Sequence, residues 1–172
     1  MKEHHLPRES GVFNIRQLLA SEAILYKSLR LEAINAEPAM FRCTNPPEAE
    51  LTDSEWEVRI KYPRLVFGLF EHGQPIGMTS ILFLNEAEAY LGQSYIRKEY
   101  RGLGLSALLY KARMESAVGL QLKRLTVSHR KSNSVSKAAN QRAGFIFTHQ
   151  ETVNWLDGTT EDALYYALDL HQ

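Results

Sequence analysis

The stretch YIRKEYRGLGLS, from Tyr95 to Ser106, joins a predicted strand to a predicted helix through a glycine-rich turn. The apolar residues after the turn recur with the spacing of a helix that buries one face: Leu105, Leu108, Leu109 and Ala112. Glycine lets the main chain approach a ligand closely, and the unsatisfied amides of a helix's first turn favour an anion. The stretch therefore predicts a phosphate-binding loop that suits a pyrophosphate. The alternative interpretation is an ordinary helix start after a glycine turn.

Two well-known phosphate-binding fingerprints are incomplete in this stretch. The chain has no G-x-x-x-x-G-K-[ST] run, and G-x-G-x-x-G fails because the residue three positions after Gly104 is Ala107. What is present is R-x-x-G-x-S, from Arg101 to Ser106, with a second glycine at Gly102. The loop is thus of neither of those two types.

A second motif begins about 30 residues downstream, at Asn133, and ends in Gly144-Phe145. Asn133 is suited to cap a helix, Gly144 to end it in a left-handed turn, and Phe145 to begin the next strand. This arrangement predicts that Asn133 and Asn140 lie beside a ligand held between the two helices.

Together the two motifs resemble the GNAT superfamily of N-acetyltransferases, whose coenzyme A loop reads [QR]-x-x-G-x-[GA] and whose next element reads N-x-x-[AS], a helix and G-F. Ser106 departs from the usual last residue but keeps the side chain small. The resemblance covers roughly residues 12–170. It implies acetyl-CoA as co-substrate, with main-chain groups of the segment after the strand contacting the pantetheine arm. The cofactor-binding residues that it implies are Ile96, Arg97, Lys98, Arg101, Gly102, Leu103, Gly104, Leu105, Ser106, Asn133 and Asn140.

The remaining patterns predict seven strands and four helices. Strands are expected at 12–18, 65–70, 75–84, 88–96, 124–128, 145–155 and 163–170. Helices are expected from a cap at Ser21 to about Ala36, from a Thr52-x-x-Glu55 capping box, from about Gly104 to Val118, and after Asn133. This order matches the resembled family. It implies an α/β (α+β) fold with a seven-stranded, mixed and mostly antiparallel sheet, a splayed central parallel pair, and helices on both faces.

Length and composition favour one domain over residues 1–172, with 1–11 as a flexible tail. The single cysteine, Cys43, excludes an internal disulfide and a cysteine zinc cluster. No signal peptide or membrane span is visible, so we expect a cytoplasmic protein. His4 and His5 are interpreted as solvated residues of the tail.

The chain has zero net charge, but its charges are segregated. Residues 97–142 contain eleven lysines and arginines and only two acids, Glu99 and Glu115. Such a segment would attract a polyanionic small molecule such as coenzyme A. Some of these cations are expected to be solvated helix residues, namely Lys111, Arg113, Lys123 and Lys137.

The proton-transfer groups are where this sequence departs from its relatives. Many members carry a tyrosine seven residues after the capping asparagine; here that residue is Asn140, whose amide cannot supply a proton. Relatives often place a glutamate where this chain has Tyr90. Tyr90 and His129 are therefore the candidate bases, against the simpler readings of a packing aromatic and a loop residue. Cys43 as a covalent nucleophile is the competing mechanism.

The leading hypothesis is direct acetyl transfer to a primary amine in a ternary complex, without a metal. The alternative is a non-catalytic acyl-CoA-binding module, because the usual tyrosine and glutamate are missing. A nucleic-acid binder is disfavoured, since only Tyr100 and Tyr110 interrupt the basic segment. A membrane is not expected as a partner. The sequence leaves open whether the acceptor is a small molecule or a protein amine, and whether the chain forms a homodimer.

Overall fold

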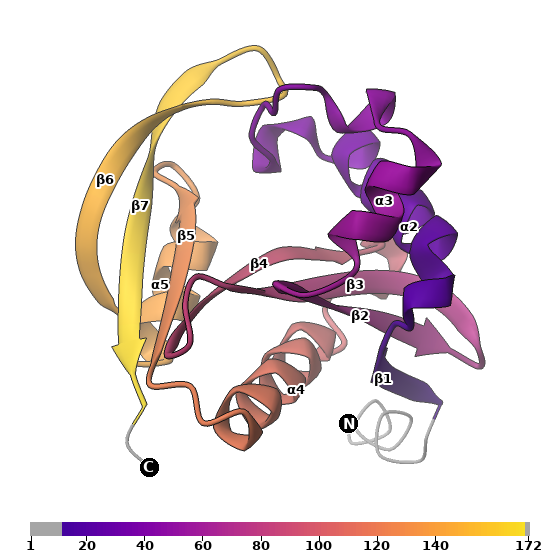
Figure 1. Ribbon diagram of the computed structural model, residues 1–172. Coiled ribbons are helices and arrows are strands. Elements are labelled where there is room, and N and C mark those ends of the chain that lie inside the picture. Colours follow the sequence, from indigo (N-terminus) through magenta and orange to yellow (C-terminus); the bar gives the residue numbers. More distant parts are fainter. Residues whose placement is uncertain (1–11, 171–172) are drawn as a thin grey trace.

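The computed structural model describes residues 12–170, which form one seven-stranded sheet in the order β1-β2-β3-β4-β5-β7-β6 (Figure 1). Neighbouring strands are antiparallel except β4 and β5, which are parallel. The predicted mixed, mostly antiparallel sheet is thus confirmed. The strands are β1 (Phe13–Gln17), β2 (Arg64–Glu71), β3 (Gln74–Phe83), β4 (Glu88–Ile96), β5 (Arg124–Arg130), β6 (Ile146–Asn154) and β7 (Thr160–Asp169).

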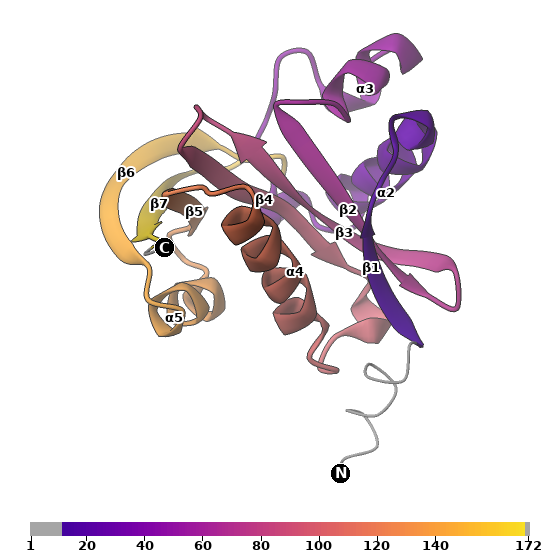
Figure 2. The same cartoon turned by 60° about the horizontal axis from the view of Figure 1, so that its bottom comes forward.

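The helices cover both faces of the sheet, as predicted (Figure 2). On one face lie α2 (Ala23–Ala36) and α3 (Asp53–Arg59), and on the other lie α4 (Leu105–Gly119) and α5 (Ser134–Arg142). Short 3-10 turns complete the described elements: η2 (Ala20–Glu22), η3 (Pro38–Met40), η4 (Glu48–Glu50) and η5 (Lys98–Tyr100). Within residues 12–170, no helix is both long and apolar enough to cross a membrane.

Alternation along the strands supplies a separate apolar core to each face of the sheet. Tyr26 of α2 and Trp56 of α3 pack edge to face, 5.2 Å between ring centroids, over Val66 and Met78. On the other face, Ala117 of α4 belongs to a cluster that includes residues of β3, β4 and β5, among them Ile81, Leu91 and Leu125. The sheet is therefore held between two cores.

The two parallel strands separate after a short contact, as the resemblance implied. Pairing joins Glu88–Tyr90 of β4 to Arg124–Thr126 of β5 and does not extend further. Beyond it β4 contains a bulge, with Gln93 at a φ of 58°. From Leu91 onward, the edge of β4 therefore has no strand partner on the β5 side in the described part of the chain.

Several element boundaries differ from the prediction. Strand β5 runs to Arg130 instead of ending at Ser128, so His129 belongs to the strand and not to a loop. Ser21 is not a helix cap, because it lies inside η2 and α2 begins only at Ala23. The carboxylate of Glu22 closes this turn instead, accepting from the Leu19 amide at 2.8 Å. Strand β7 begins at Thr160 rather than at Ala163, because pairing with β6 continues to the hairpin turn.

Arg113 was expected to be solvated, and this expectation is wrong. It lies in the buried stripe of α4 with Leu105, Leu109 and Ala117, and only 9% of its surface is exposed. Its Nε atom is buried and makes no hydrogen bond within residues 12–170. Burial lowers the pKa of Arg113 to about 10, because the charged form is poorly solvated there.

Replacing Arg113 with methionine is expected to stabilise the ligand-free protein by about 1–3 kcal/mol, the usual cost of a buried unsatisfied polar group. Arg113 is charged at pH 7 in both the folded and the unfolded chain, so the full penalty is present there. Urea unfolding at pH 7 measures the change. Arg124→Met, at a half-buried and ion-paired position, is the control. A destabilised Arg113→Met variant would contradict this reading of the buried arginine.

Candidate active site

The loop before α4 has the main-chain geometry of an anion site. Gly102 and Gly104 have φ angles of 81° and 79°, in the left-handed region that glycine adopts without strain. Among residues 12–170, no side chain caps α4, whereas Thr52 caps α3 and Asn133 caps α5. A Cβ atom added to Gly102 would meet no atom of the described residues within 4 Å, so they leave the loop open on that side. The first-turn amides of α4 therefore remain available to an anion.

The side chains of the loop divide between core and solvent. Leu103 and Leu105 pack in the apolar cluster around Phe13 and Ile96. Ser106 and Lys98 are exposed. The apolar residues thus hold the loop against the sheet and leave its polar residues at the surface.

The two arginines of the loop are paired with carboxylates of α2 and the residue that follows it. Arg97 binds Glu32 through two hydrogen bonds of 2.8 Å, and this pairing lowers the pKa of Glu32. Arg101 forms an ion pair with Glu37 and donates from Nε to the Ile96 carbonyl at 3.0 Å. Both cations therefore tie the loop to α2, and their charge is already compensated.

Part of the main chain predicted to contact the pantetheine arm is also engaged. The Arg97 amide donates to the Ile76 carbonyl at 3.0 Å, and the Ile96 carbonyl accepts from Arg101. The main chain that lacks a strand partner on the β5 side lies earlier, at the bulge of β4. On the β3 side of this bulge, the hydroxyls of Thr79 and Ser80 bond the Gly92 carbonyl at 3.4 and 3.2 Å. Sequence reasoning missed the bulge, although a glycine within a predicted strand is its usual signal.

The second motif behaves locally as predicted. The Asn133 side chain accepts from the Ser136 amide at 3.0 Å, and Gly144, at a φ of 94°, follows the end of α5. Asn140 is half-buried, and its side-chain amide makes no hydrogen bond to any residue of 12–170. Its donor group is therefore free for a ligand.

Tyr90 lies at one end of a chain of hydrogen bonds on the face of α2 and α3. Its hydroxyl is 2.5 Å from Ser128 Oγ on β5. Ser128 also accepts from Arg42 Nη2 at 2.9 Å, and Arg42 Nη1 donates to the Tyr165 hydroxyl at 2.5 Å. Sequence reasoning missed Arg42, Ser128 and Tyr165, because the three come from separate segments and form no motif.

His129 lies on the other face of the sheet, 6% exposed. Its Nδ1 is 2.7 Å from the Arg130 carbonyl, and its Nε2 is 3.1 Å from the Tyr166 hydroxyl. A carbonyl only accepts, so Nδ1 carries the hydrogen and Nε2 accepts from Tyr166. The structure therefore does not bring the two candidate bases together.

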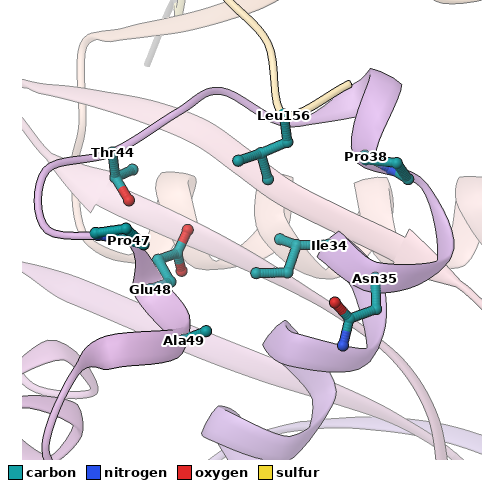
Figure 3. Close-up of a pocket in the computed structure, with 8 residues that line it drawn as sticks. All are labelled: Ile34, Asn35, Pro38, Thr44, Pro47, Glu48, Ala49 and Leu156. Atoms are coloured by element: carbon teal, nitrogen blue, oxygen red, sulfur yellow. The ribbon is translucent and has the colours of Figure 1, made fainter. Parts of the chain in front are cut away.

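Two further features lie near the end of α2. Cys43 is exposed, and no hydrogen bond joins its sulfur to a histidine within residues 12–170. A pocket of about 300 Å³ lies beside the segment 38–49, and in Figure 3 Ile34 and Leu156 point toward one another across it. Its lining residues are Ile34, Asn35, Pro38, Thr44, Pro47, Glu48, Ala49 and Leu156.

The acetyltransferase (GNAT) family model matches residues 31–145. With the fold and the loop geometry described above, this match shows that the chain belongs to the GNAT acetyltransferase family, as the two motifs predicted. The protein is therefore an acetyltransferase by family. No curated protein sequence matches the chain.

Solved structures with the same fold are distant in sequence. A putative acetyltransferase from Acinetobacter baylyi is 22% identical with a TM-score of 0.74, covering 92% of this chain and 93% of its own. A putative acetyltransferase from Salmonella typhimurium, solved with acetyl-CoA, is 14% identical with a TM-score of 0.74, covering 94% and 96%. The ribosomal-protein-S18-alanine N-acetyltransferase from Escherichia coli is 18% identical with a TM-score of 0.69, covering 93% and 95%.

Proposed function

We propose that this protein binds acetyl-CoA and transfers its acetyl group directly to an amine in a ternary complex. The observation that carries the proposal is the uncapped start of α4, preceded by two left-handed glycines within R-x-x-G-x-S. A second feature is the unpaired edge of β4, which begins where strands β4 and β5 separate. The two features suit a ligand with a pyrophosphate and an extended amide-containing arm.

Three parts of the chain fit three parts of this cofactor. The amides of Leu105 and Ser106 would hold the pyrophosphate, and the open edge of β4 would bond the amides of the pantetheine arm. The Asn140 amide would donate a hydrogen bond near the sulfur, without supplying a proton. When bound, the cofactor supplies an acetyl thioester. The chain's own contribution is to position the reacting groups and to carry away a proton.

Tyr90 is better placed than His129 to receive the proton that the amine loses. Its hydroxyl bonds Ser128, and either oxygen of that pair can donate. As the Tyr90 oxygen takes the proton of the amine, it gives its own hydrogen to Ser128, and Ser128 gives one to solvent water, so neither hydroxyl gains a net charge. The His129 acceptor nitrogen is already occupied by Tyr166 within the core. Tyr90 with Ser128 is therefore the proton route that we propose.

Removing only the hydroxyl, in Tyr90→Phe, is expected to lower turnover by roughly 100-fold and to leave the affinity for coenzyme A nearly unchanged. His129→Asn is expected to reduce stability and to change turnover much less. Steady-state kinetics with separate measurement of coenzyme A binding checks both. Wild-type turnover in Tyr90→Phe would discard the proposed route.

Amine-dependent release of free thiol from acetyl-CoA tests the proposed function. A panel of small amines, amino acids and peptides is offered, and thiol is measured against a reaction without amine. Release that depends on one class of amine supports acetyl transfer. A protein that binds coenzyme A but releases no thiol with any amine would instead be the acyl-CoA-binding module.

A further inference from the structure

Arg42 lies in the segment between α2 and α3 and pairs with Trp155, the residue after β6, in an isolated antiparallel bridge. Its guanidinium is 5.2 Å from the ring centroid of Tyr165 and 5.9 Å from that of Trp155. Two of its nitrogens donate to the hydroxyls of Tyr165 and Ser128. The side chain is thus half-buried and fixed in orientation by hydroxyls and aromatic rings.

The guanidinium of Arg42 forms no ion pair with a carboxylate in the described part of the chain. Arg130 is the relevant comparison, because its guanidinium also lies over Trp155, at 5.2 Å. Arg130 binds Asp157 at 2.9 Å and Glu161 at 2.5 Å. Of the two arginines beside Trp155, one is neutralised by two acids and the other is held by neutral hydroxyls alone.

One carboxylate, that of Glu151, interacts with the Tyr165 hydroxyl to which Arg42 also donates. The Glu151 side chain is 56% exposed, lies 3.6 Å from His149 Nε2 and forms no ion pair with Arg42. His149 stacks on Tyr165 at 4.4 Å, on the ring to which Arg42 donates. A planar cation in such a setting favours a carboxylate, which it can bind through two parallel hydrogen bonds.

We propose that Arg42 binds a carboxylate of the acceptor, so that the acceptor is a free amino acid or a similar amine with a nearby carboxylate. The inference rests on the proposed function and adds the substrate class. Ser128 bonds both Arg42 and Tyr90, so a carboxylate on Arg42 lies close to the proposed proton acceptor. A free amino acid carries its amine and carboxylate on one carbon. The N-terminus of a protein lacks that carboxylate, because it forms the first peptide bond.

The test compares free amino acids with their amides and with short peptides as acceptors, using thiol release from acetyl-CoA. At least one free amino acid is expected to be acetylated, with kcat/KM roughly 10- to 100-fold above that of its amide, the range expected for a lost hydrogen-bonded charge pair. Arg42→Gln is expected to remove this difference, and Arg42→Lys to retain part of it. Arg124→Gln, the same charge change at a position away from the cluster, is expected to behave as the wild type.

A thermal shift with coenzyme A in each variant shows that the fold and the cofactor site are intact. Equal use of free amino acids and amides, or a preference for peptide N-termini, would overturn the carboxylate site alone and leave acetyl transfer in place. Unchanged discrimination in a folded Arg42→Gln variant would do the same. Absence of acetylation with every acceptor would overturn this inference together with the proposed function.

Discussion

Gly104→Val is expected to weaken coenzyme A binding by at least about 100-fold, the loss of one or two hydrogen bonds to a charged group. Gly104 has a φ of 79°, a conformation that a β-branched side chain adopts only under strain. The added side chain would also lie between the ligand and the first amides of α4. Isothermal titration with coenzyme A measures the loss.

Gly158→Val is the matched control for this substitution. Gly158 has a φ of 86° and open space around a built Cβ atom, but it belongs to the turn between β6 and β7. Both variants are expected to lose stability of about 1–3 kcal/mol from main-chain strain. Only Gly104→Val is expected to lose affinity. Equal affinities in the two variants would show that the loop does not hold the pyrophosphate.

Arg30→Met is expected to destabilise the protein by about 3–5 kcal/mol, because it leaves the buried carboxylate of Glu48 without a partner. Arg30 and Glu48 join through hydrogen bonds of 2.8 and 2.9 Å, with side chains only 8% and 3% exposed. At about 2–4 °C per kcal/mol for a chain of this size, the melting temperature is expected to fall by roughly 6–20 °C.

The double variant Arg30→Met/Glu48→Leu separates loss of the pair from loss of packing. Removing both charges eliminates the unpaired carboxylate, and apolar replacement of a buried pair is often neutral or stabilising. Most of the stability is therefore expected to return. Arg30 Nη1 is itself buried and makes no hydrogen bond within residues 12–170, which further reduces the stability that the native pair contributes. A double variant as unstable as Arg30→Met would show that Arg30 contributes mainly through its contacts, including the Phe41 ring at 4.6 Å.

The order of strands and helices could be predicted because its signals are local. Glycines at positive φ, capping side chains such as Thr52 and Asn133, and alternation along the strands all act within a few residues. Arg113 was misjudged although its signal was also local. Arg113 follows Leu105 and Leu109 at intervals of four residues, which places it on the buried face of α4. It was nevertheless expected to be solvated, because its side chain is charged.

The partners of charged residues could not be predicted in this way. Arg97 and Arg101 were expected to meet the cofactor, and the structure pairs them with Glu32 and Glu37 from a distant part of the sequence. Arg42 meets Ser128 and Tyr165 only because the sheet places β5 beside β7 and the β6–β7 turn beside the segment after α2 (Figure 1). Such contacts depend on topology rather than on spacing along the chain.

The thermal stability of the wild-type protein in coenzyme A tests the cofactor site most directly, since it requires no knowledge of the acceptor. A ligand at about 100 times its dissociation constant stabilises the folded state by roughly 2.7 kcal/mol. The melting temperature is then expected to rise by roughly 5–10 °C. A well-folded protein whose melting temperature does not change in millimolar coenzyme A or acetyl-CoA would contradict the proposed cofactor site and the mechanism built on it.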